Sequence, residues 1–400
     1  MTQSSHPSLR WRTAFAVTMV TAMGIGPFAI HGVGALAPLI VPEFGLTRTQ
    51  LGSLTTVAFT VAAALSVAAG RRVDVLGGRT GLVLLFTTGG GAVALIAAAP
   101  SLWWLWLGAV LAGGGLALSN PVTNRLIAAH IPPGRRGLQI GLKQSGVPMF
   151  TAVIGFVLPP LAVVLGWRGA LLAGIGLVAV GLALSFATIP PTVPLAPDRA
   201  AAPRPKLDPV VRWLAAYACS IGIAVQATLA YAPLFAYERV GLPVAFAGMT
   251  TGATGAAGMV GRLAWGRITE RLNRPIASLV ALATVAVASL MLVLASEVAG
   301  PATLWPGLLG FGLSAIASHA VVMFAVIRES DSAQLGRASG VASMGLFLGF
   351  MIGPVLFGTV VDATDSYRVG WAMAGASCLV ALLISVTWQL RSRYGSGDAH

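Results

Sequence analysis

The stretch GRRVDVLGGR occupies residues 70–79, and a similar stretch, GRITERLNR, occupies residues 266–274. The two begin 196 residues apart, and other residues match at the same offset. The matched pairs are Gly45 and Gly241, Leu46 and Leu242, Gly52 and Gly248, Thr55 and Thr251, Gly70 and Gly266, Arg71 and Arg267, and Asp74 and Glu270. Chance does not easily give this many matches in one register, so the chain is predicted to be a repeat of two halves.

A proline-rich stretch, IPPTVPLAPDRAAAPRPKLDPV at residues 189–210, lies between the two halves. Its prolines cannot continue a helix, and together with its charges they are typical of an extended linker. The sequence therefore predicts a first helical bundle at 1–188, a cytoplasmic linker at 189–210 and a second helical bundle at 211–400.

The composition indicates that most of the chain is surrounded by lipid. Hydrophobic residues make up 56% and charged residues 9%, and the mean hydropathy is +0.84, whereas a soluble domain carries roughly 25% charged residues. A backbone in lipid must form its hydrogen bonds internally, so long apolar runs predict an all-α integral membrane fold. Twelve transmembrane helices are expected, at 13–40, 48–70, 79–98, 102–127, 138–164, 168–188, 211–237, 244–265, 275–296, 301–327, 335–360 and 368–390.

The distribution of Lys and Arg predicts the orientation. With the amino terminus in the cytoplasm, eighteen of these residues fall on the cytoplasmic side and four, Arg48, Arg168, Arg239 and Arg368, on the outer side. Cytoplasmic loops of membrane proteins carry such an excess. We expect a multi-pass protein of the inner (plasma) membrane with both termini in the cytoplasm. The net charge of +13 then reflects orientation and not a nucleic-acid partner.

Residues 70–79 read Gly-x-x-x-Asp-x-x-Gly-x-Arg, which resembles the signature loop between the second and third helices of the major facilitator superfamily. Helix number, repeat and linker agree with this resemblance. It implies two six-helix bundles related by a pseudo-two-fold axis, which move a solute by rocker-switch alternating access. The Gly-Trp-Arg sequence at 166–168 is also similar to the family. However, the span at 138–164 lacks the Gly-Pro pair common in the drug antiporters of this family.

Both signature loops are predicted to form a gate at the cytoplasmic face. Gly70 lets another helix approach closely, and Asp74 supplies an acid beside basic residues such as Arg79. Such a cluster can latch the two halves and release as they rock; the alternative is that Asp74 only satisfies its local turn. The predicted gating residues are Gly70, Arg71, Asp74, Arg79, Gly266, Arg267 and Glu270.

Two cations inside the predicted spans are candidates for binding, because a charge in lipid costs roughly 2.5 to 3.5 kcal/mol on insertion scales. Lys143 is followed by Gln144. Arg125 follows Asn120 and Asn124, which share one helix face. The alternative for both cations is that they extend to the cytoplasmic interface.

Two histidines inside the spans are further candidates. His31 lies in the first span, and Gln226 corresponds to it in the seventh at an offset of 195. The resemblance implies that these two helices line a central cavity, with Tyr231 one or two turns further on. His319 is the other candidate, and packing is the alternative for either histidine. The predicted substrate-binding residues are His31, Asn120, Asn124, Arg125, Lys143, Gln144, Gln226, Tyr231 and His319.

No Asp or Glu falls in the middle of a predicted span. Cations and amides without acids favour an anionic substrate, and they leave a coupled proton to His31, His319 or the substrate. We therefore expect a monomeric secondary transporter of a small organic or inorganic anion, coupled to protons. We expect no catalytic residue, metal site or cofactor.

Two other functions are consistent with the sequence. The many Gly and Met residues favour a drug or metabolite efflux antiporter. An integral-membrane enzyme would need an acidic or metal-binding cluster at an interface, and the sequence has none. It also has no Gly-x-x-x-x-Gly-Lys loop for ATP, which favours a transporter driven by gradients.

Overall fold

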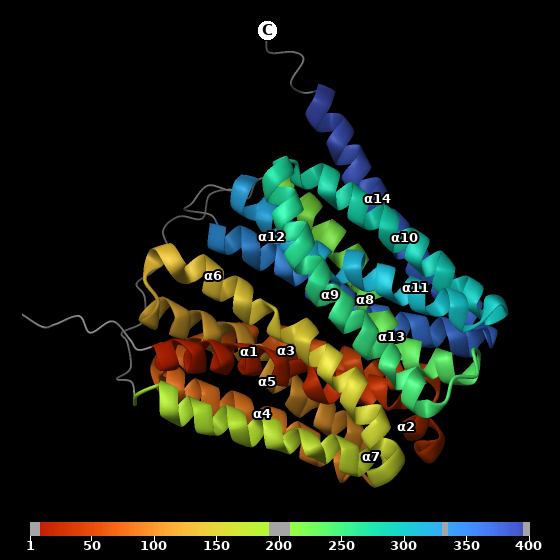
Figure 1. The fold of residues 1–400 in the computed structure, drawn as a ribbon, viewed down its shortest axis with the longest axis horizontal. Coiled ribbons are helices and arrows are strands. Elements are labelled where there is room, and N and C mark those ends of the chain that lie inside the picture. The colour runs from red at the N-terminus through yellow and green to blue at the C-terminus, as the bar shows by residue number, and fades with distance from the viewer. Residues whose placement is uncertain (1–8, 192–208, 330–334, 395–400) are drawn as a thin grey trace, which may run out of the picture.

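The computed structural model describes residues 9–191, 209–329 and 335–394, and within these ranges it contains helices and no strand (Figure 1). The first half contains α1 (Leu9–Ala35), α2 (Ala37–Phe44), α3 (Arg48–Leu76), α4 (Gly78–Ala97), α5 (Leu102–His130), α6 (Pro133–Gln144) and α7 (Gly146–Thr188). The second half contains α8 (Pro209–Glu238), α9 (Val244–Leu272), α10 (Pro275–Ala299), α11 (Pro301–Phe311), the π-helical turn η1 (Gly312–Ile316), α12 (Ser318–Glu329), α13 (Leu335–Thr364) and α14 (Tyr367–Tyr394). The predicted all-α fold is confirmed, and most of the predicted linker lies outside the described residues.

The helices have the length and composition of membrane spans. In the described chain, nine helices are long and apolar enough to cross a membrane. One of them turns sharply inside α7 at Gly166, where φ is 70° and ψ is 163°. The helices α3 and α9 are each 29 residues long but carry more polar residues. The membrane fold is thus confirmed, whereas the count of twelve spans stays a prediction.

Three of the predicted helices are broken in the structure. The predicted span 13–40 divides into α1 and α2, 138–164 divides at the boundary of α6 and α7, and 301–327 passes through η1. Proline explains the second break, since Pro148 has no N–H to bond the carbonyl four residues before it. Hydropathy did not predict these breaks because an apolar run looks the same whether its helix is continuous or broken.

Matched glycines of the repeat have matched surroundings. Gly45 and Gly241 both have positive φ, 59° and 76°, which favours glycine at each of these turns. A Cβ added to Gly52 of α3 would collide with the backbone of α13, and one added to Gly248 of α9 would collide with α7. These glycines therefore permit close packing between the halves at symmetry-related places.

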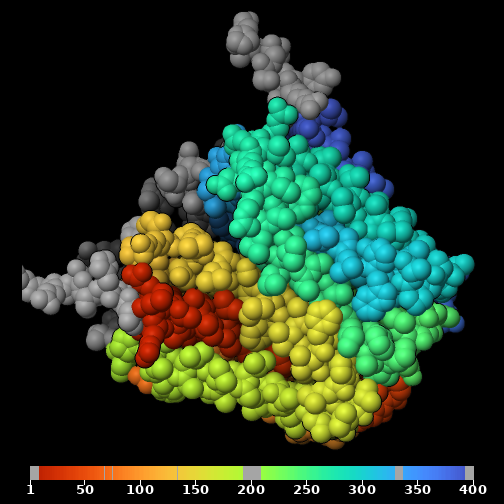
Figure 2. Space-filling view, in the orientation of Figure 1, coloured from red at the N-terminus to blue at the C-terminus, as the bar shows by residue number. Residues whose placement is uncertain are grey.

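The two halves meet at one end of the molecule and diverge at the other (Figure 1). At the end where α2 lies, the α2 end, α3 packs against α13 and α7 packs against α9. At the opposite end, the α6 end, the principal neighbours of α6 and of α12 belong to their own halves. Figure 2 shows the halves touching along α7 and α9 and separating beside α6. The interface is therefore closed at the α2 end and open at the α6 end.

Candidate functional site

Lys143 is buried near the break between α6 and α7, with 1% of its surface exposed. Its ammonium donates hydrogen bonds to the side-chain oxygens of Asn124 (2.6 Å), Thr123 (2.9 Å) and Asn120 (3.2 Å) on α5. An ammonium has three hydrogens, so three neutral acceptors occupy all of them. The Gln144 amide lies beside them, 3.5 Å from the Asn120 oxygen. Lys143 therefore joins α6 to α5 and does not extend to a surface.

Four polar side chains from both halves lie at one level. Each is ten residues from the α6 end of its helix: Asn120 in α5, Lys143 in α6, Arg262 in α9 and His319 in α12. At about 1.5 Å per residue, each lies roughly 15 Å from that end of its helix. The structure thus brings basic and amide groups of both halves to a similar distance from the α6 end.

Arg262 was not among the residues predicted from the sequence. It is half-buried in α9. Its Nη1 donates to the carbonyl oxygen of Gln144 in the first half (2.9 Å), and its Nε donates to that of Ile316 in the second half (3.2 Å). The available signal was an arginine inside the apolar run 244–265, close to the basic residues of the second signature loop. Arg262 connects the two halves directly.

Two other predicted residues, His319 and Arg125, lie near this level. The His319 Nδ1 atom is buried and has no hydrogen-bond partner among the described residues, and its ring is close enough to Arg262 to experience its charge. Arg125 is half-buried on α5. Among residues with described side chains, no carboxylate forms an ion pair with Lys143 or Arg262. The site is therefore cationic.

His31 and Gln226 form a separate polar contact between the halves. They are 4% and 2% exposed. The His31 Nδ1 atom forms a hydrogen bond with the Thr151 hydroxyl at 3.0 Å, and the same hydroxyl lies 2.9 Å from the Val147 carbonyl oxygen. The Gln226 side chain lies close to the same imidazole. The two residues matched by the repeat thus meet, as a buried contact in this conformation.

Tyr231 is part of the closure at the α2 end. It is fully buried, and its ring stacks on Phe357 with centroids 4.6 Å apart. Its hydroxyl contacts the carbonyl oxygen of Arg48 in the first half and that of Pro354 in the second (3.0 Å). The predicted contact of Tyr231 with substrate would therefore require this closure to open.

Two acids of the second half complete the closure. Asp362 accepts hydrogen bonds from the first two backbone N–H groups of α3, those of Arg48 (2.9 Å) and Thr49 (2.7 Å). The Arg48 guanidinium forms an ion pair with Glu238 (2.6 Å) and donates to the Tyr367 hydroxyl (3.2 Å). A helix start has unpaired N–H groups and a partial positive charge, which a carboxylate satisfies. Opening the α2 end must break all of these bonds.

Two other ion pairs at the α2 end each lie within one half. Arg368 pairs with Glu297 at 2.7 Å in the second half. In the first half, Arg168 pairs with Glu43, and the Trp167 indole donates to the same carboxylate. Burial alone would raise the pKa of Glu43, but the hydrogen bonds from Trp167 and Arg168 and the charge of Arg168 together lower that pKa. The Gly-Trp-Arg turn therefore stabilises one half and does not join the two.

The predicted gate lies at the α6 end, where the halves are apart. A Cβ added to Gly70 or Gly266 would meet nothing within 4 Å, so the close approach expected at Gly70 is absent from this conformation. The Arg79 guanidinium lies over the Phe186 ring, 4.4 Å from its centroid. Three charged residues of the gate are exposed: Arg71, Arg267 and Glu270. The Asp74 side chain lies outside the described residues, and the gating role stays a prediction.

Replacing Gly70 by Val is expected to leave folding unchanged and to lower transport at least tenfold. The added side chain has free space in this conformation but would obstruct a helix that approaches when the α6 end closes. Uptake and the melting temperature would be measured together. Gly176→Val is the matched control, because Gly176 also has open space around it but lies in the second part of α7. Normal uptake by Gly70→Val would show that no helix packs there.

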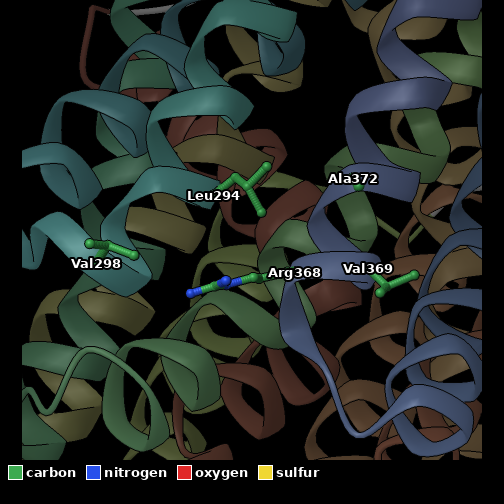
Figure 3. Close-up of a pocket in the computed structure, with 5 residues that line it drawn as sticks. All are labelled: Leu294, Val298, Arg368, Val369 and Ala372. Carbon is green, nitrogen blue, oxygen red and sulfur yellow. The ribbon is translucent and has the colours of Figure 1, made fainter.

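A surface pocket lies away from these residues, between α10 and α14. It is lined by Leu294, Val298, Arg368, Val369 and Ala372. The Arg368 side chain crosses the space between the two helices (Figure 3) and is paired with Glu297. Both helices belong to the second half, so this pocket does not contribute to the interface between the halves.

Comparisons with known proteins agree with the geometry. The model of the Major Facilitator Superfamily matches residues 13–331. An uncharacterized MFS-type transporter of Mycobacterium tuberculosis is 26% identical over 93% of this chain and 84% of its own length. The probable sulfoacetate transporter SauU of Cupriavidus necator is 25% identical over 88% of each chain.

Among solved structures, the fold resembles a bacterial homolog of the human lysosomal transporter Spinster in its inward-facing and unoccupied conformation. The TM-score is 0.78 at 15% identity, over 96% of this chain and 98% of the other. That likeness concerns the fold alone. Since the family match covers well over half of the sequence, the chain belongs to the Major Facilitator Superfamily of membrane transporters.

Proposed function

We propose that this transporter moves a small organic or inorganic anion by alternating access. One observation carries the proposal. Lys143 and Arg262 lie at one level, and neither forms an ion pair with a carboxylate among the residues whose side chains are described. A cation inside a membrane is costly when uncompensated. An anion entering from the open α6 end would reduce that cost.

The probable sulfoacetate transporter SauU, one of the relatives, supports the same class of substrate. Sulfoacetate carries a sulfonate and a carboxylate, and both are ionised near neutral pH. A guanidinium binds such planar or tetrahedral oxyanions through two parallel hydrogen bonds. We therefore favour a carboxylate or sulfonate over a simple halide.

The proposal includes an orientation. The excess of Lys and Arg near the α6 end favours a cytoplasmic location for that end and for both termini. Under this assignment the conformation is inward-facing, in the inner membrane, and the protein works as a monomer. The closure at the α2 end would then separate the site from the outside.

The proposal also includes coupling to protons. The spans predicted from the sequence contain no central acid, so a histidine or the substrate would carry the proton. The His31 ring forms a hydrogen bond with Thr151. His319 has a buried nitrogen without a partner in the described part of the chain, which makes it the better placed of the two.

Binding of ligands that differ only in charge would test the proposal. Benzoate, benzamide and benzamidinium share one shape and carry charges of −1, 0 and +1. A ligand that binds only the folded protein raises its melting temperature. We expect benzoate and sulfoacetate to stabilise the purified transporter and benzamidinium to have no effect. Stabilisation by the neutral or cationic compound alone would exclude an anion site.

A further inference from the structure

Arg262 bonds to a carbonyl oxygen that the fold of the first half leaves without its usual partner. In an α-helix, the Gln144 carbonyl would accept from the amide four residues later, but that residue is Pro148, which has no N–H. Arg262 of the second half supplies the missing donor at 2.9 Å. The contact therefore occurs at a helix break, not on a regular helix surface.

The second acceptor of Arg262 is also a carbonyl at a helix break. Ile316 ends the π-helical turn η1. The Ala320 amide, which would bond to the Ile316 carbonyl in a regular α-helix, bonds instead to the Ala317 carbonyl at 3.0 Å. The Arg262 Nε atom fills this gap at 3.2 Å. One guanidinium thus connects a break in each half at the level of Lys143.

These two bonds leave most of the guanidinium unused. A guanidinium has five N–H donors, and two of them serve Gln144 and Ile316. No other hydrogen bond or ion pair of Arg262 occurs among the described residues. The Lys143 ammonium, in contrast, has all three hydrogens engaged and is 1% exposed, whereas Arg262 is half-buried.

We propose that Arg262 is the residue that binds the oxyanion of the substrate directly, with the His319 imidazole beside it and with Lys143 acting through its charge. This inference rests on the proposed anion transport and names the ligand-binding group of that site. The fork of donors left on Arg262 suits two oxygens of a carboxylate or sulfonate. The unpartnered His319 Nδ1 atom, in its protonated tautomer or in the imidazolium, can donate to the same group.

Isothermal titration of the full-length purified transporter with sulfoacetate and with benzoate tests the assignment. One of these two anions is expected to bind the wild type. For that anion, Arg262→Gln should raise the dissociation constant at least tenfold. Arg262→Lys should recover part of the lost affinity, because it restores the charge without the paired N–H donors of the guanidinium. Arg271→Gln is the control, since Arg271 lies on the same helix, exposed at its α6 end. It should bind like the wild type.

Pro148→Ala separates binding from a structural role. Alanine at 148 returns an N–H to the Gln144 carbonyl, so the bond from Arg262 is no longer needed while its charge stays in place. We expect Pro148→Ala to bind the anion within about threefold of the wild type. If Pro148→Ala loses as much affinity as Arg262→Gln, Arg262 is only a structural connection and the inference is wrong.

The results distinguish this inference from the proposed function. Anion binding by the wild type together with unchanged binding by Arg262→Gln would overturn the role of Arg262 and leave anion transport standing. Failure of the wild type to bind either anion would count against anion transport itself. If Arg262→Gln does not fold, Arg262→Lys decides: wild-type affinity in that variant contradicts the need for the guanidinium fork.

Discussion

Replacing Asp362 by Asn is expected to shift the protein about 30-fold toward conformations that are open at the α2 end, corresponding to about 2 kcal/mol. Asp362 accepts from two N–H groups at the start of α3, across the interface between the halves. Asparagine removes the negative charge and has one acceptor oxygen in place of two. Both the charge-assisted hydrogen bonds and the favourable interaction with the helix start are weakened.

Distances between two spin labels would measure the shift. Ala98 in the first half and Ala302 in the second are exposed near the α2 end and can carry the labels. A longer distance should become dominant in Asp362→Asn. The control is Glu297→Gln, which removes a carboxylate of an ion pair at the same end but within one half. Equal distance distributions in wild type and Asp362→Asn would show that this contact does not hold the closure.

Replacing Lys143 by Gln is expected to weaken anion binding about 30-fold. At an effective dielectric constant of 20, a cation and an anion separated by about 8 Å would attract each other by about 2 kcal/mol. Glutamine can still donate to the oxygens of Asn120 and Asn124, so the variant removes the charge with less disturbance of α5 and α6 than alanine would cause. Titration with the anion identified by the melting screen gives the affinity.

Two further variants distinguish the effect of the Lys143 charge from that of its hydrogen bonds. Lys143→Arg keeps the charge in a different geometry and should retain part of the affinity. Lys143→Ala removes both the charge and the hydrogen bonds to α5 and should lose at least as much affinity as the glutamine variant, with a lower melting temperature. Wild-type affinity in Lys143→Gln, with a lower melting temperature, would mean that Lys143 only joins the two helices.

The fold could be predicted from the sequence to a large extent. The apolar stretches are long and do not alternate with polar residues, so a backbone in lipid can satisfy its hydrogen bonds only as α-helices. The helices predicted at 79–98 and 275–296 therefore agree closely with α4 and α10. Matched glycines such as Gly52 and Gly248 indicated the repeat, and the structure shows why they match, since both permit close contact between the halves. Helix breaks were not predictable from hydropathy.

The candidate site was predictable in its chemistry but not in its geometry. The few charged and amide residues inside the predicted spans included Lys143 and its neighbours Asn120 and Asn124. The structure shows that these side chains are in contact. Sequence could not show that these neighbours use every hydrogen of the ammonium, because that depends on how α5 packs on α6. It also gave no basis for pairing Arg262 with Gln144, since that contact depends on the break at Pro148 and on the docking of the halves.

The contacts at the α2 end also could not be predicted from the sequence. Arg48 was counted as one charge in a loop, which was sufficient for the orientation argument. Its partners Glu238 and Tyr367 lie far from it in sequence and approach it only across the interface. Tyr231, whose contact with substrate stays a prediction, is part of this closure in the present conformation. Residues that join two halves in one conformation give no local pattern in the sequence.

Uptake by proteoliposomes measures the charge selectivity of transport. Sulfoacetate, sorbitol and choline are water-soluble compounds with net charges that are negative, zero and positive at neutral pH, and sorbitol and choline have no acidic group. An anion transporter should show saturable uptake of sulfoacetate, or of another small carboxylate or sulfonate that competes with it, and no protein-dependent uptake of sorbitol or choline. Saturable uptake of choline or sorbitol, with none of any anion, would contradict anion transport.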